Sequence, residues 1–259
     1  MKNTALITGA SSGIGLELAR IHAEKGGDLI VVARSADKLD ALKTELEATH
    51  SVTVLPIVAD LSVPAAAQEV YAKVKEAGIQ VEYLVNNAGF GLRGKFHELP
   101  WQRQHQMMQL NMIALSELTY LFLPDFVARN SGRILNNSST ASLLPGPLQA
   151  VYFANKAYVA SFSNALAEEL RDTNITVTNL MPGATETGFA KASGMEDTAL
   201  FDKAFSARSV AEDGYNAMLA GKLDIMSGLT FSQKVMMAMI PLTPKKMLLQ
   251  QIRQMQEVG

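Results

Sequence analysis

The stretch TGASSGIG occupies residues 8–15 and joins an apolar run, Thr4–Thr8, to a helix-like pattern, Ile14–Lys25. Glycines in such a turn allow the backbone to bend tightly and to approach a pyrophosphate closely. The amide groups at the start of the helix would then face that negative charge. The spacing is Gly-x-x-x-Gly-x-Gly rather than Gly-x-Gly-x-x-Gly, and an ordinary strand–turn–helix connection is the alternative. The stretch predicts the start of a nucleotide-binding α/β fold.

The rest of the chain repeats this alternation of strand and helix. Strands without polar alternation, separated by helices, are typical of a parallel sheet covered on both faces. Right-handed crossovers make such a sheet doubly wound, with ligands at the carboxyl ends of its strands. We therefore predict a single α/β domain with a Rossmann-type doubly wound parallel sheet of about seven strands. The predicted strands are Thr4–Thr8, Asp28–Ala33, Val52–Val58, Val81–Asn86, Gly132–Ser138, Ile175–Met181 and, more weakly, Leu223–Ser227; the predicted helices are Ile14–Lys25, Ala36–Ala48, Pro64–Ala77, Trp101–Ala128 and Tyr152–Arg171.

The composition argues against several classes of site. The 259 residues carry a net charge of −2, without the basic character of a nucleic-acid-binding protein. The lack of cysteine excludes disulfides, thiolate catalysis and cysteine-bound zinc. The chain shows no signal-peptide pattern and no uninterrupted apolar run of transmembrane length. We expect a cytoplasmic protein with no nucleic-acid partner and no metal, because the histidines also lack ligand spacing: His22, His50, His97 and His105.

The end of the second predicted strand bears on the choice between two nicotinamide cofactors. A carboxylate there would accept hydrogen bonds from the ribose and repel a 2′-phosphate. The sequence instead has Val31-Val32-Ala33-Arg34-Ser35, and Asp37 falls within the next helix. Arg34 can donate charge-assisted hydrogen bonds to a phosphate, which predicts NADP(H) rather than NAD. The alternatives are that Arg34 stacks on adenine or faces solvent. Asp60, after the third strand, is placed to accept a bond from the adenine amine or to act as a turn residue.

Tyr152 and Lys156 are four residues apart in a predicted helix, so they share one face. A phenol has a pKa of about 10 and keeps its proton at neutral pH. A nearby ammonium and an oxidised nicotinamide would both favour the phenolate. Tyr152 can then act as an acid in carbonyl reduction and as a base in alcohol oxidation. Such pairs also arise by chance on solvated helices, so this prediction depends on the glycine-rich turn.

Together these motifs resemble the classical short-chain dehydrogenase/reductase family over roughly residues 3–190. A weaker similarity is to its broad-specificity and 11β-hydroxysteroid-dehydrogenase-like branch, through Ala33-Arg34-Ser35 and Asn87-Ala88-Gly89-Phe90-Gly91. The resemblance implies the sheet order 3-2-1-4-5-6-7 and a homodimer in which the two long helices pair between subunits. It rests on Thr8–Gly15, Asp60, Asn86–Gly89, Asn111, Ser139, Tyr152, Lys156 and Pro182-Gly183.

The resemblance implies four catalytic residues, Ser139, Tyr152, Lys156 and Asn111. Ser139 lies thirteen residues before Tyr152 and would hold and polarise the substrate oxygen, with Ser138 as its rival. Asn111 would hold a water that continues a proton relay through Lys156. An asparagine inside a helix is otherwise a poor helix former.

The resemblance also implies a cofactor site that runs across the carboxyl ends of the strands. Asn86–Gly89 would steady the sheet and pass beside the adenosine ribose. Thr185 and Thr187 would touch the nicotinamide carboxamide, although a Pro-Gly turn with incidental threonines is the alternative. The expected cofactor contacts are Gly9, Ser11, Ser12, Gly13, Ile14, Gly15, Arg34, Asp60, Leu61, Asn87, Ala88, Gly89, Tyr152, Lys156, Pro182, Gly183, Thr185 and Thr187.

The chain departs from the family mainly after the seventh predicted strand. We predict one cofactor-binding and catalytic domain, 1–229, whose substrate segment is about 186–208, and a helical extension of the same domain, 230–259. The extension replaces the tail that joins tetramers in many members, which favours a dimer. Its apolar stretch Val235–Ile240 is expected to cover the pocket or contact a second subunit. A less favoured alternative is contact with anionic lipid, helped by Lys245, Lys246 and Arg253.

Smaller departures lie closer to the site. Asn155 and Asn137 stand where the family usually has a small residue and an apolar residue. Neither replaces a reacting group. Four apolar residues are candidates for the walls of the substrate pocket: Phe90, Leu143, Leu144 and Phe189.

These observations predict an NADP(H)-dependent oxidoreductase that interconverts an apolar ketone or aldehyde with its alcohol. One alternative is a sugar-nucleotide epimerase, which also uses Tyr-x-x-x-Lys; the glycine spacing and the short C-terminal region disfavour it. The other is a redox-sensing protein that binds NADP without turnover. Such a regulator could dispense with the catalytic residues, whereas this chain keeps all four.

Overall fold

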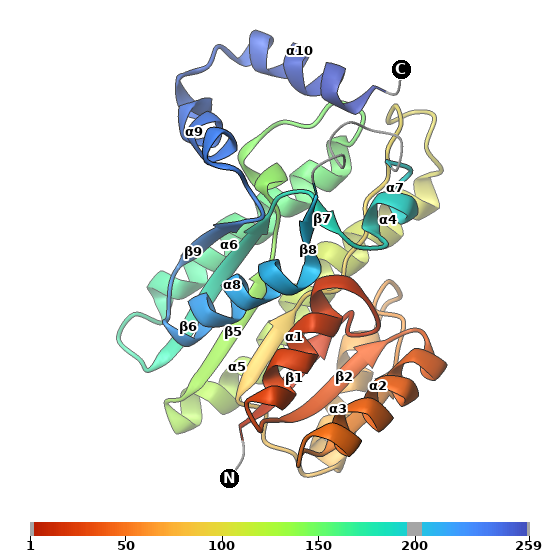
Figure 1. Cartoon of the computed structure of the whole chain (residues 1–259), viewed down its shortest axis with the longest axis vertical. Helices are drawn as coiled ribbons and strands as arrows, with labels where there is room; N and C mark the ends of the chain where they lie inside the picture. The colour runs from red at the N-terminus through yellow and green to blue at the C-terminus, as the bar shows by residue number, and fades with distance from the viewer. Residues whose placement is uncertain (1–2, 196–203, 258–259) are drawn as a thin grey trace.

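A seven-stranded parallel sheet forms the centre of the computed structural model, which describes residues 3–195 and 204–257. Its strand order is β3-β2-β1-β4-β5-β6-β9 (Figure 1). This confirms the predicted order, because β9 corresponds to the seventh predicted strand. The strands are β1 Thr4–Thr8, β2 Asp28–Ala33, β3 Val54–Val58, β4 Tyr83–Asn86, β5 Gly132–Asn137, β6 Ile175–Pro182 and β9 Asp224–Ser227.

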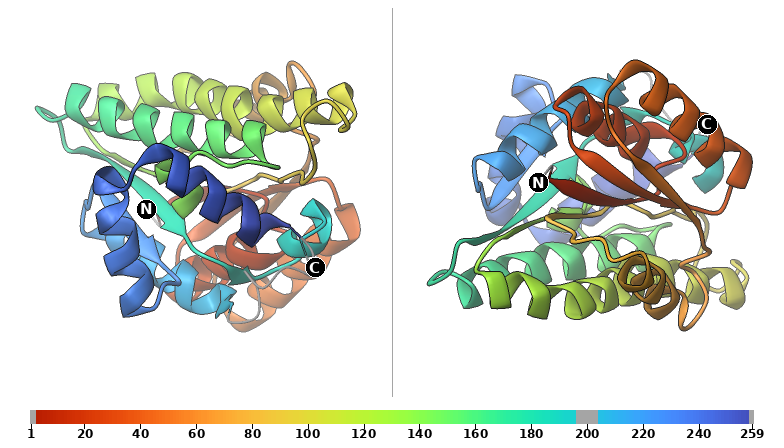
Figure 2. Two further views of the ribbon diagram at one scale, coloured as in Figure 1. Left: turned by 90° about the horizontal axis from the view of Figure 1, so that it is seen from above. Right: turned by 90° about the horizontal axis from the view of Figure 1, so that it is seen from below.

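Helices cover both faces of the sheet (Figure 2). One core contains residues of α1, α2 and α8, and the other contains residues of α3, α5 and α6. Neighbouring strand residues such as Leu6 and Ile7 point into different cores, so the strands show no polar alternation. The helices of these two layers are α1 Gly13–Glu24, α2 Ala36–Thr49 and α8 Ala207–Leu219 on one face, and α3 Ala66–Glu76, α5 Leu115–Arg129 and α6 Ala150–Glu169 on the other.

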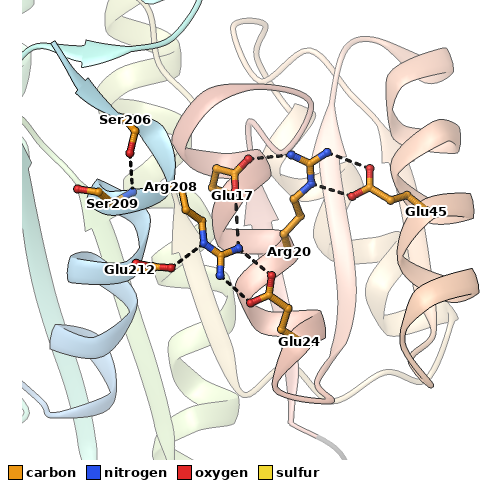
Figure 3. A network of polar contacts seen from close by, with 8 residues as sticks. All are labelled: Glu17, Arg20, Glu24, Glu45, Ser206, Arg208, Ser209 and Glu212. Atoms are coloured by element: carbon orange, nitrogen blue, oxygen red, sulfur yellow. Dashed lines mark hydrogen bonds and ion pairs between the residues drawn. The ribbon is translucent and has the colours of Figure 1, made fainter.

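Ion pairs link the three helices of the first layer at their outer surface (Figure 3). Arg20 of α1 lies 2.7 Å from Glu45 of α2, and Arg208 of α8 lies 2.6 Å from Glu24 of α1. Arg208 also contacts Glu212 one turn further along α8, at 2.7 Å. Because these groups are partly exposed to solvent, the pairs fix helix positions more than they add stability.

The predicted helix Trp101–Ala128 contains an unpredicted π-helical segment. It consists of α4 Trp101–Met108, the π segment Gln109–Ala114 and α5. The wider turn lets Asn111 point into the protein, where its Nδ2 donates to the Phe90 carbonyl at 2.9 Å. Among the described residues, this run of 29 is the one helix long and apolar enough to cross a membrane. Phe122 and Phe126 within it are buried against the sheet, as in the core helix of a soluble domain.

Two strands begin later than the sequence pattern predicts. β3 starts at Val54 rather than Val52, because the Thr53 amide donates to the Asp28 carboxylate at 2.7 Å instead of joining the ladder. β4 starts at Tyr83 rather than Val81. The affected residues lie at the amino-terminal ends of the strands, so the edge that carries the predicted site is unchanged.

Short elements after β6 were not predicted. β7 Thr185–Glu186 and β8 Phe205–Ser206 form a separate parallel pair at the two ends of the substrate segment. Strands of two residues carry no periodic pattern that a sequence can reveal. Between them lies α7 Phe189–Ser193, and positions 196–203 of the predicted substrate segment fall outside the described residues.

The C-terminal extension is helical, as predicted. It comprises α9 Phe231–Met239, the short 3₁₀ turn η4 Ile240–Leu242 and α10 Lys245–Gln256. The side chains of Thr230 and Gln233 form a capping box that starts α9. Both helices lie at the end of the molecule opposite the N-terminus (Figure 1).

Candidate active site

A cavity of about 830 Å³ opens at the carboxyl ends of the strands. Its walls come from the turn between β1 and α1, the ends of β2 to β6, helix α6, the segment after β6 and the C-terminal helices. This is where a doubly wound sheet places its ligands. Of the predicted catalytic and cofactor-contacting residues, all but Gly15 and Asn111 line the cavity.

The glycine-rich turn forms one end of the cavity. Gly9 and Gly13 have φ angles of +68° and +56°, a region that favours glycine. A Cβ atom on Gly15 would lie 2.4 Å from the Gly9 carbonyl oxygen, so the turn packs too closely for any side chain there. Gly9, Ser11, Ser12 and Gly13 all line the cavity, at the start of helix α1, where a pyrophosphate would be expected to bind.

The wall beyond the turn carries Arg34 and Asp60. Arg34 follows β2, is exposed and lines the cavity. Although burial raises the pKa of Asp60, the Ser62 hydroxyl and amide, at 2.7 and 3.0 Å, hold it below its usual range, and Arg34 adds to this effect. Asp60 therefore has a turn-forming role in addition to its place on the cavity wall beside Leu61.

The end of β4 is tied to the glycine-rich turn. The Thr8 hydroxyl accepts hydrogen bonds from the amides of Asn87 and Ala88, each at 3.0 Å. Asn87 Nδ2 donates back to the Thr8 carbonyl at 3.0 Å. Asn86 instead reaches across the sheet and donates to Asn136 on β5 at 2.9 Å. The two asparagines thus fix the relative positions of the strand ends.

Helix α6 brings Tyr152 and Lys156 into the centre of the cavity. Both side chains are buried, and Lys156 Nζ lies 5.8 Å from the centre of the Tyr152 ring. Burial raises the pKa of Tyr152 to about 12, while a hydrogen bond with Ser139 opposes part of that rise. Burial lowers the pKa of Lys156 to about 8. The protein therefore holds a protonated phenol beside a cation whose proton is easily lost.

Two adjacent serines end β5 in different surroundings. The Ser138 hydroxyl donates to the Lys156 carbonyl at 2.9 Å and is 3% exposed, so it holds α6 against the sheet. The Ser139 hydroxyl accepts from the Ala141 amide at 3.1 Å and interacts with Tyr152. Of the two, Ser139 is the one placed to share a ligand atom with Tyr152.

Asn111 lies behind the cavity wall. Its Oδ1 accepts from the Phe90 amide at 3.2 Å, and its Nδ2 donates to the same residue's carbonyl. A Cβ atom on Gly89 would lie 3.1 Å from Asn111 Oδ1 and 3.6 Å from Lys156 Nζ. The side chains of Asn111 and Lys156 therefore approach the same small residue, and a larger one at position 89 would separate them.

Asn137 contributes to the site in a way that the sequence analysis missed. Lys156 Nζ donates to the Asn137 carbonyl at 2.7 Å, and Asn137 Nδ2 donates to Asn87 Oδ1 at 2.8 Å. Asn137 therefore links the cofactor end of the site to the ammonium group. The sequence shows that Asn137 departs from the family pattern. Its contacts could not be read from the sequence, because its partners lie on α6 and after β4.

The end of β6 and the segment after it form a further wall of the cavity. Pro182, Gly183, Thr185 and Thr187, the residues expected near the nicotinamide, all line the cavity. The Thr185 hydroxyl donates to the Gly183 carbonyl at 3.0 Å, and the Thr187 hydroxyl accepts from the Phe189 amide at 3.2 Å. Both hydroxyls thus already have local partners that shape the turn.

The remaining wall is apolar and comes largely from segments far apart in the sequence. Phe90, Leu144 and Phe189 line it as predicted. Leu143 does not, because it ends the 3₁₀ turn η2 Thr140–Leu143 with its side chain 40% exposed. Met236, Met237 and Ile240 also line the cavity and belong to the stretch Val235–Ile240 that was expected to cover the pocket. Lining residues that were not expected from the sequence include Gln149, Met195, Leu248 and Ile252.

Polar contacts hold the end of α10 over this wall. Arg93 donates to the carbonyls of Gly194 and Gln256, at 2.9 and 2.8 Å. The buried Gln149 donates to Gln256 Oε1 at 2.7 Å. These contacts join residues more than 100 positions apart, so no local signal in the sequence could have revealed them. Across residues 3–195 and 204–257, no group of acidic or histidine side chains could hold a metal ion.

Comparison with known proteins gives consistent matches. Residues 3–197 match the short chain dehydrogenase family. The human very-long-chain 3-oxoacyl-CoA reductase is 34% identical over 193 residues, which cover 72% of this chain and 61% of the relative. The human 17-beta-hydroxysteroid dehydrogenase type 3 is 35% identical over 196 residues, covering 74% and 62%. The chain thus spans about three fifths of the length of these relatives.

Among solved structures, a short-chain dehydrogenase from Sphingobium yanoikuyae in complex with NADPH has a similar fold. Its TM-score to this chain is 0.83, with 30% sequence identity over 90% of this chain and 91% of the other. The match extends past the region covered by the family comparison. It therefore includes part of the C-terminal extension as well as the sheet.

Proposed function

The chain belongs to the short-chain dehydrogenase family, and from that premise we propose that it is an NADP(H)-dependent oxidoreductase of ketones or aldehydes and their alcohols. The observation that carries the proposal is the single cavity that contains Arg34, Ser139, Tyr152 and Lys156. A cofactor end and a proton-donating end are thus joined without an intervening wall. Bound NADPH supplies the hydride for such a reaction.

The residues present fit a dinucleotide. The close packing at Gly15 and the positive φ of Gly13 shape a tight turn at the start of α1, where a pyrophosphate could accept hydrogen bonds from the first amides of the helix. Arg34 would pair with the 2′-phosphate of NADP(H). Asp60, Leu61 and the Asn87–Gly89 backbone would surround the adenosine part, and Thr185 and Thr187 would lie along the nicotinamide end.

Reduction of a carbonyl group requires the protein to supply one proton to the substrate oxygen. In reduction, the Tyr152 phenol donates its proton to the substrate oxygen while Ser139 donates a hydrogen bond to the same oxygen. The Lys156 ammonium stabilises the phenolate that remains. Reduction begins with the protonated phenol, which is the form that burial favours by raising the pKa of Tyr152 to about 12. After each turnover, Asn111 and Lys156 would return a proton to Tyr152.

The substrate is proposed to be an apolar carbonyl compound. Phe90, Leu144, Phe189, Met237 and Ile252 line the cavity, and methionine and aromatic side chains accommodate apolar ligands of varied shape. Two similar human proteins are named as acting on very-long-chain 3-oxoacyl-CoA, which carries an apolar acyl chain, and on 17-beta-hydroxysteroids, which have an apolar ring skeleton. We propose a lipid-like ketone of this general class.

A homodimer is proposed from the surface of α4, α5 and α6. Tyr120 is 76% exposed, and Tyr158 stacks on Phe162 with ring centres 5.9 Å apart on the surface of α6. Exposed aromatic side chains on long helices are typical of an interface between subunits. The expected cytoplasmic location stays a prediction.

Titration of the cofactors and an assay with a panel of apolar ketones test the proposal. Wild type should bind NADPH more tightly than NADH and oxidise it when a ketone is added. Arg34→Ala should weaken NADPH binding by about 1.5–3 kcal/mol, the scale of a charged hydrogen bond, and barely change NADH binding. Lys38→Ala, one turn further along on α2, is the matched control and should change neither. A wild type that prefers NADH, or an equal loss for both cofactors, would overturn the NADP(H) assignment.

A further inference from the structure

The outer side of the C-terminal extension carries an exposed apolar stripe. Phe231, Val235, Met239 and Leu242 are 83%, 48%, 51% and 75% exposed. They follow one another at intervals of four, four and three residues, which places them along one side of α9 and η4. We call these four residues the α9 stripe.

The opposite side of the same helix faces the active site. Met236, Met237 and Ile240 line the cavity, and they lie about half a helical turn away from the α9 stripe. The helix is therefore apolar on both sides, and one of these sides lines the cavity. No residue of α9 is buried. With residues 3–195 and 204–257 in place, the other side stays exposed, and an exposed apolar stripe is typical of a surface that binds a partner.

The charges around the stripe are all of one sign. Lys234 flanks it on α9, and Lys245 and Lys246 begin α10 directly after it. Residues 229–256 contain four of the chain's 23 basic residues and none of its 25 acidic residues. Arg253 is paired with Glu257 at 2.8 Å, whereas no described carboxylate forms an ion pair with the three lysines. The extension is thus cationic in a chain whose net charge is −2.

We propose that the α9 stripe and Lys234, Lys245 and Lys246 form a docking surface for an anionic lipid bilayer. Aromatic and aliphatic side chains on one side of a helix, with lysines at their border, match an interfacial helix that lies in the plane of the headgroups. A symmetric contact between two copies would instead bring the same lysines together without a counter-charge. Docking requires no turnover, so this proposal is independent of the proposed reaction.

Flotation of the full chain with vesicles tests the docking surface. The chain should float with vesicles of phosphatidylcholine and phosphatidylserine in a two-to-one ratio, more weakly with phosphatidylcholine alone, and less as salt increases. Phe231→Ser/Leu242→Ser and Lys245→Glu/Lys246→Glu should each lower the partition coefficient on the anionic vesicles by on the order of tenfold or more. The four substituted side chains, those of Phe231, Leu242, Lys245 and Lys246, are exposed. Both variants should therefore keep the wild-type melting temperature and NADPH affinity.

Matched substitutions away from the extension provide the control. Val63→Ser/Phe96→Ser removes exposed apolar residues, and Lys73→Glu/Lys222→Glu reverses exposed charges. Both should float like wild type. The proposal is overturned if wild type does not bind the anionic vesicles, or if the stripe variants bind as well as the controls. The competing explanation is that the α9 stripe forms a contact between two copies of the chain. Light scattering identifies this case, because Phe231→Ser/Leu242→Ser would then have a lower molar mass in solution than wild type.

Discussion

The two serines at the end of β5 should respond differently to the loss of their hydroxyl groups. Ser139→Ala removes the group that shares the substrate oxygen with Tyr152 and should lower kcat/KM on the order of 10²-fold or more. Ser138→Ala removes the hydrogen bond to the Lys156 carbonyl and should lower the free energy of unfolding by about 1 kcal/mol, with a smaller loss of rate. Steady-state kinetics and urea unfolding of both variants measure these effects. Equal rates in the two variants would mean that the wrong serine has been assigned.

The buried ammonium of Lys156 should give carbonyl reduction a characteristic pH profile. Its pKa is lowered to about 8, so the charge is present below that pH and is lost above it. Tyr152 keeps its proton over this range, since its pKa is about 12. We therefore expect kcat/KM for reduction to be constant below about pH 8 and to fall above it.

A variant with a permanent charge distinguishes this explanation from others. Lys156→Arg should be slower, because the guanidinium is larger, but its kcat/KM should no longer fall near pH 8. A pH profile recorded at saturating NADPH makes the comparison. If the fall occurs at the same pH in Lys156→Arg, another group is titrating.

Individual site residues could be predicted from the sequence where one element carries them. Tyr152 and Lys156 share a face of α6 because of helical periodicity alone, and Arg34 follows β2 directly. The Asn137 contacts could not be predicted, since they join a backbone carbonyl on β5 to a side chain on α6. The choice of Ser139 over Ser138 came from family spacing and is supported by the surroundings of the two hydroxyls.

A substitution in the turn between β1 and α1 tests whether the close packing of this turn controls cofactor affinity. In Gly15→Ala the new Cβ atom would lie 2.4 Å from the Gly9 carbonyl oxygen and 2.3 Å from Asn87 Nδ2. The turn must open, and NADPH affinity measured by fluorescence titration should fall on the order of tenfold or more.

Gly26, just after the other end of α1, provides the control for this substitution. A Cβ atom on Gly26 would meet nothing within 4 Å, but its φ of +78° disfavours alanine. Gly26→Ala should therefore cost about 1 kcal/mol of stability and leave NADPH affinity unchanged. Equal losses of affinity in the two variants would show that general destabilisation, not the turn, determines binding.

Element types were predictable, whereas local irregularities were not. The strands and helices of the sheet follow from apolar periodicity, which is set by the burial of both sheet faces. The π segment Gln109–Ala114 depends on the hydrogen bonds between Asn111 and Phe90, which are 21 positions apart. The late start of β3 likewise depends on Asp28, a residue of the neighbouring strand. In each case a hydrogen bond to a residue distant in the sequence overrides the local pattern.

At the scale of the whole molecule, the sheet could be predicted from the sequence, whereas the position of the C-terminal helices could be predicted only in part. The sheet order and the position of the cavity follow from right-handed crossovers and from the edge where the strands end. The position of α10 depends on Arg93 and Gln149, which bind its last turn at Gln256. The extension was expected to cover the pocket or to contact a partner. The inner side of α9 does line the cavity, and its outer side is the proposed lipid surface.

We propose above all that this one cavity brings a hydride donor and the Tyr152 proton to the same carbonyl group. The most direct measurement is the rate of ketone-dependent NADPH oxidation by Tyr152→Phe, with NADPH affinity determined on the same sample. The substitution keeps the ring and the shape of the cavity and removes only the acidic hydroxyl. The account predicts a rate lower by on the order of 10²–10⁴-fold with nearly unchanged NADPH affinity. A Tyr152→Phe protein that reduces ketones at the wild-type rate would contradict it.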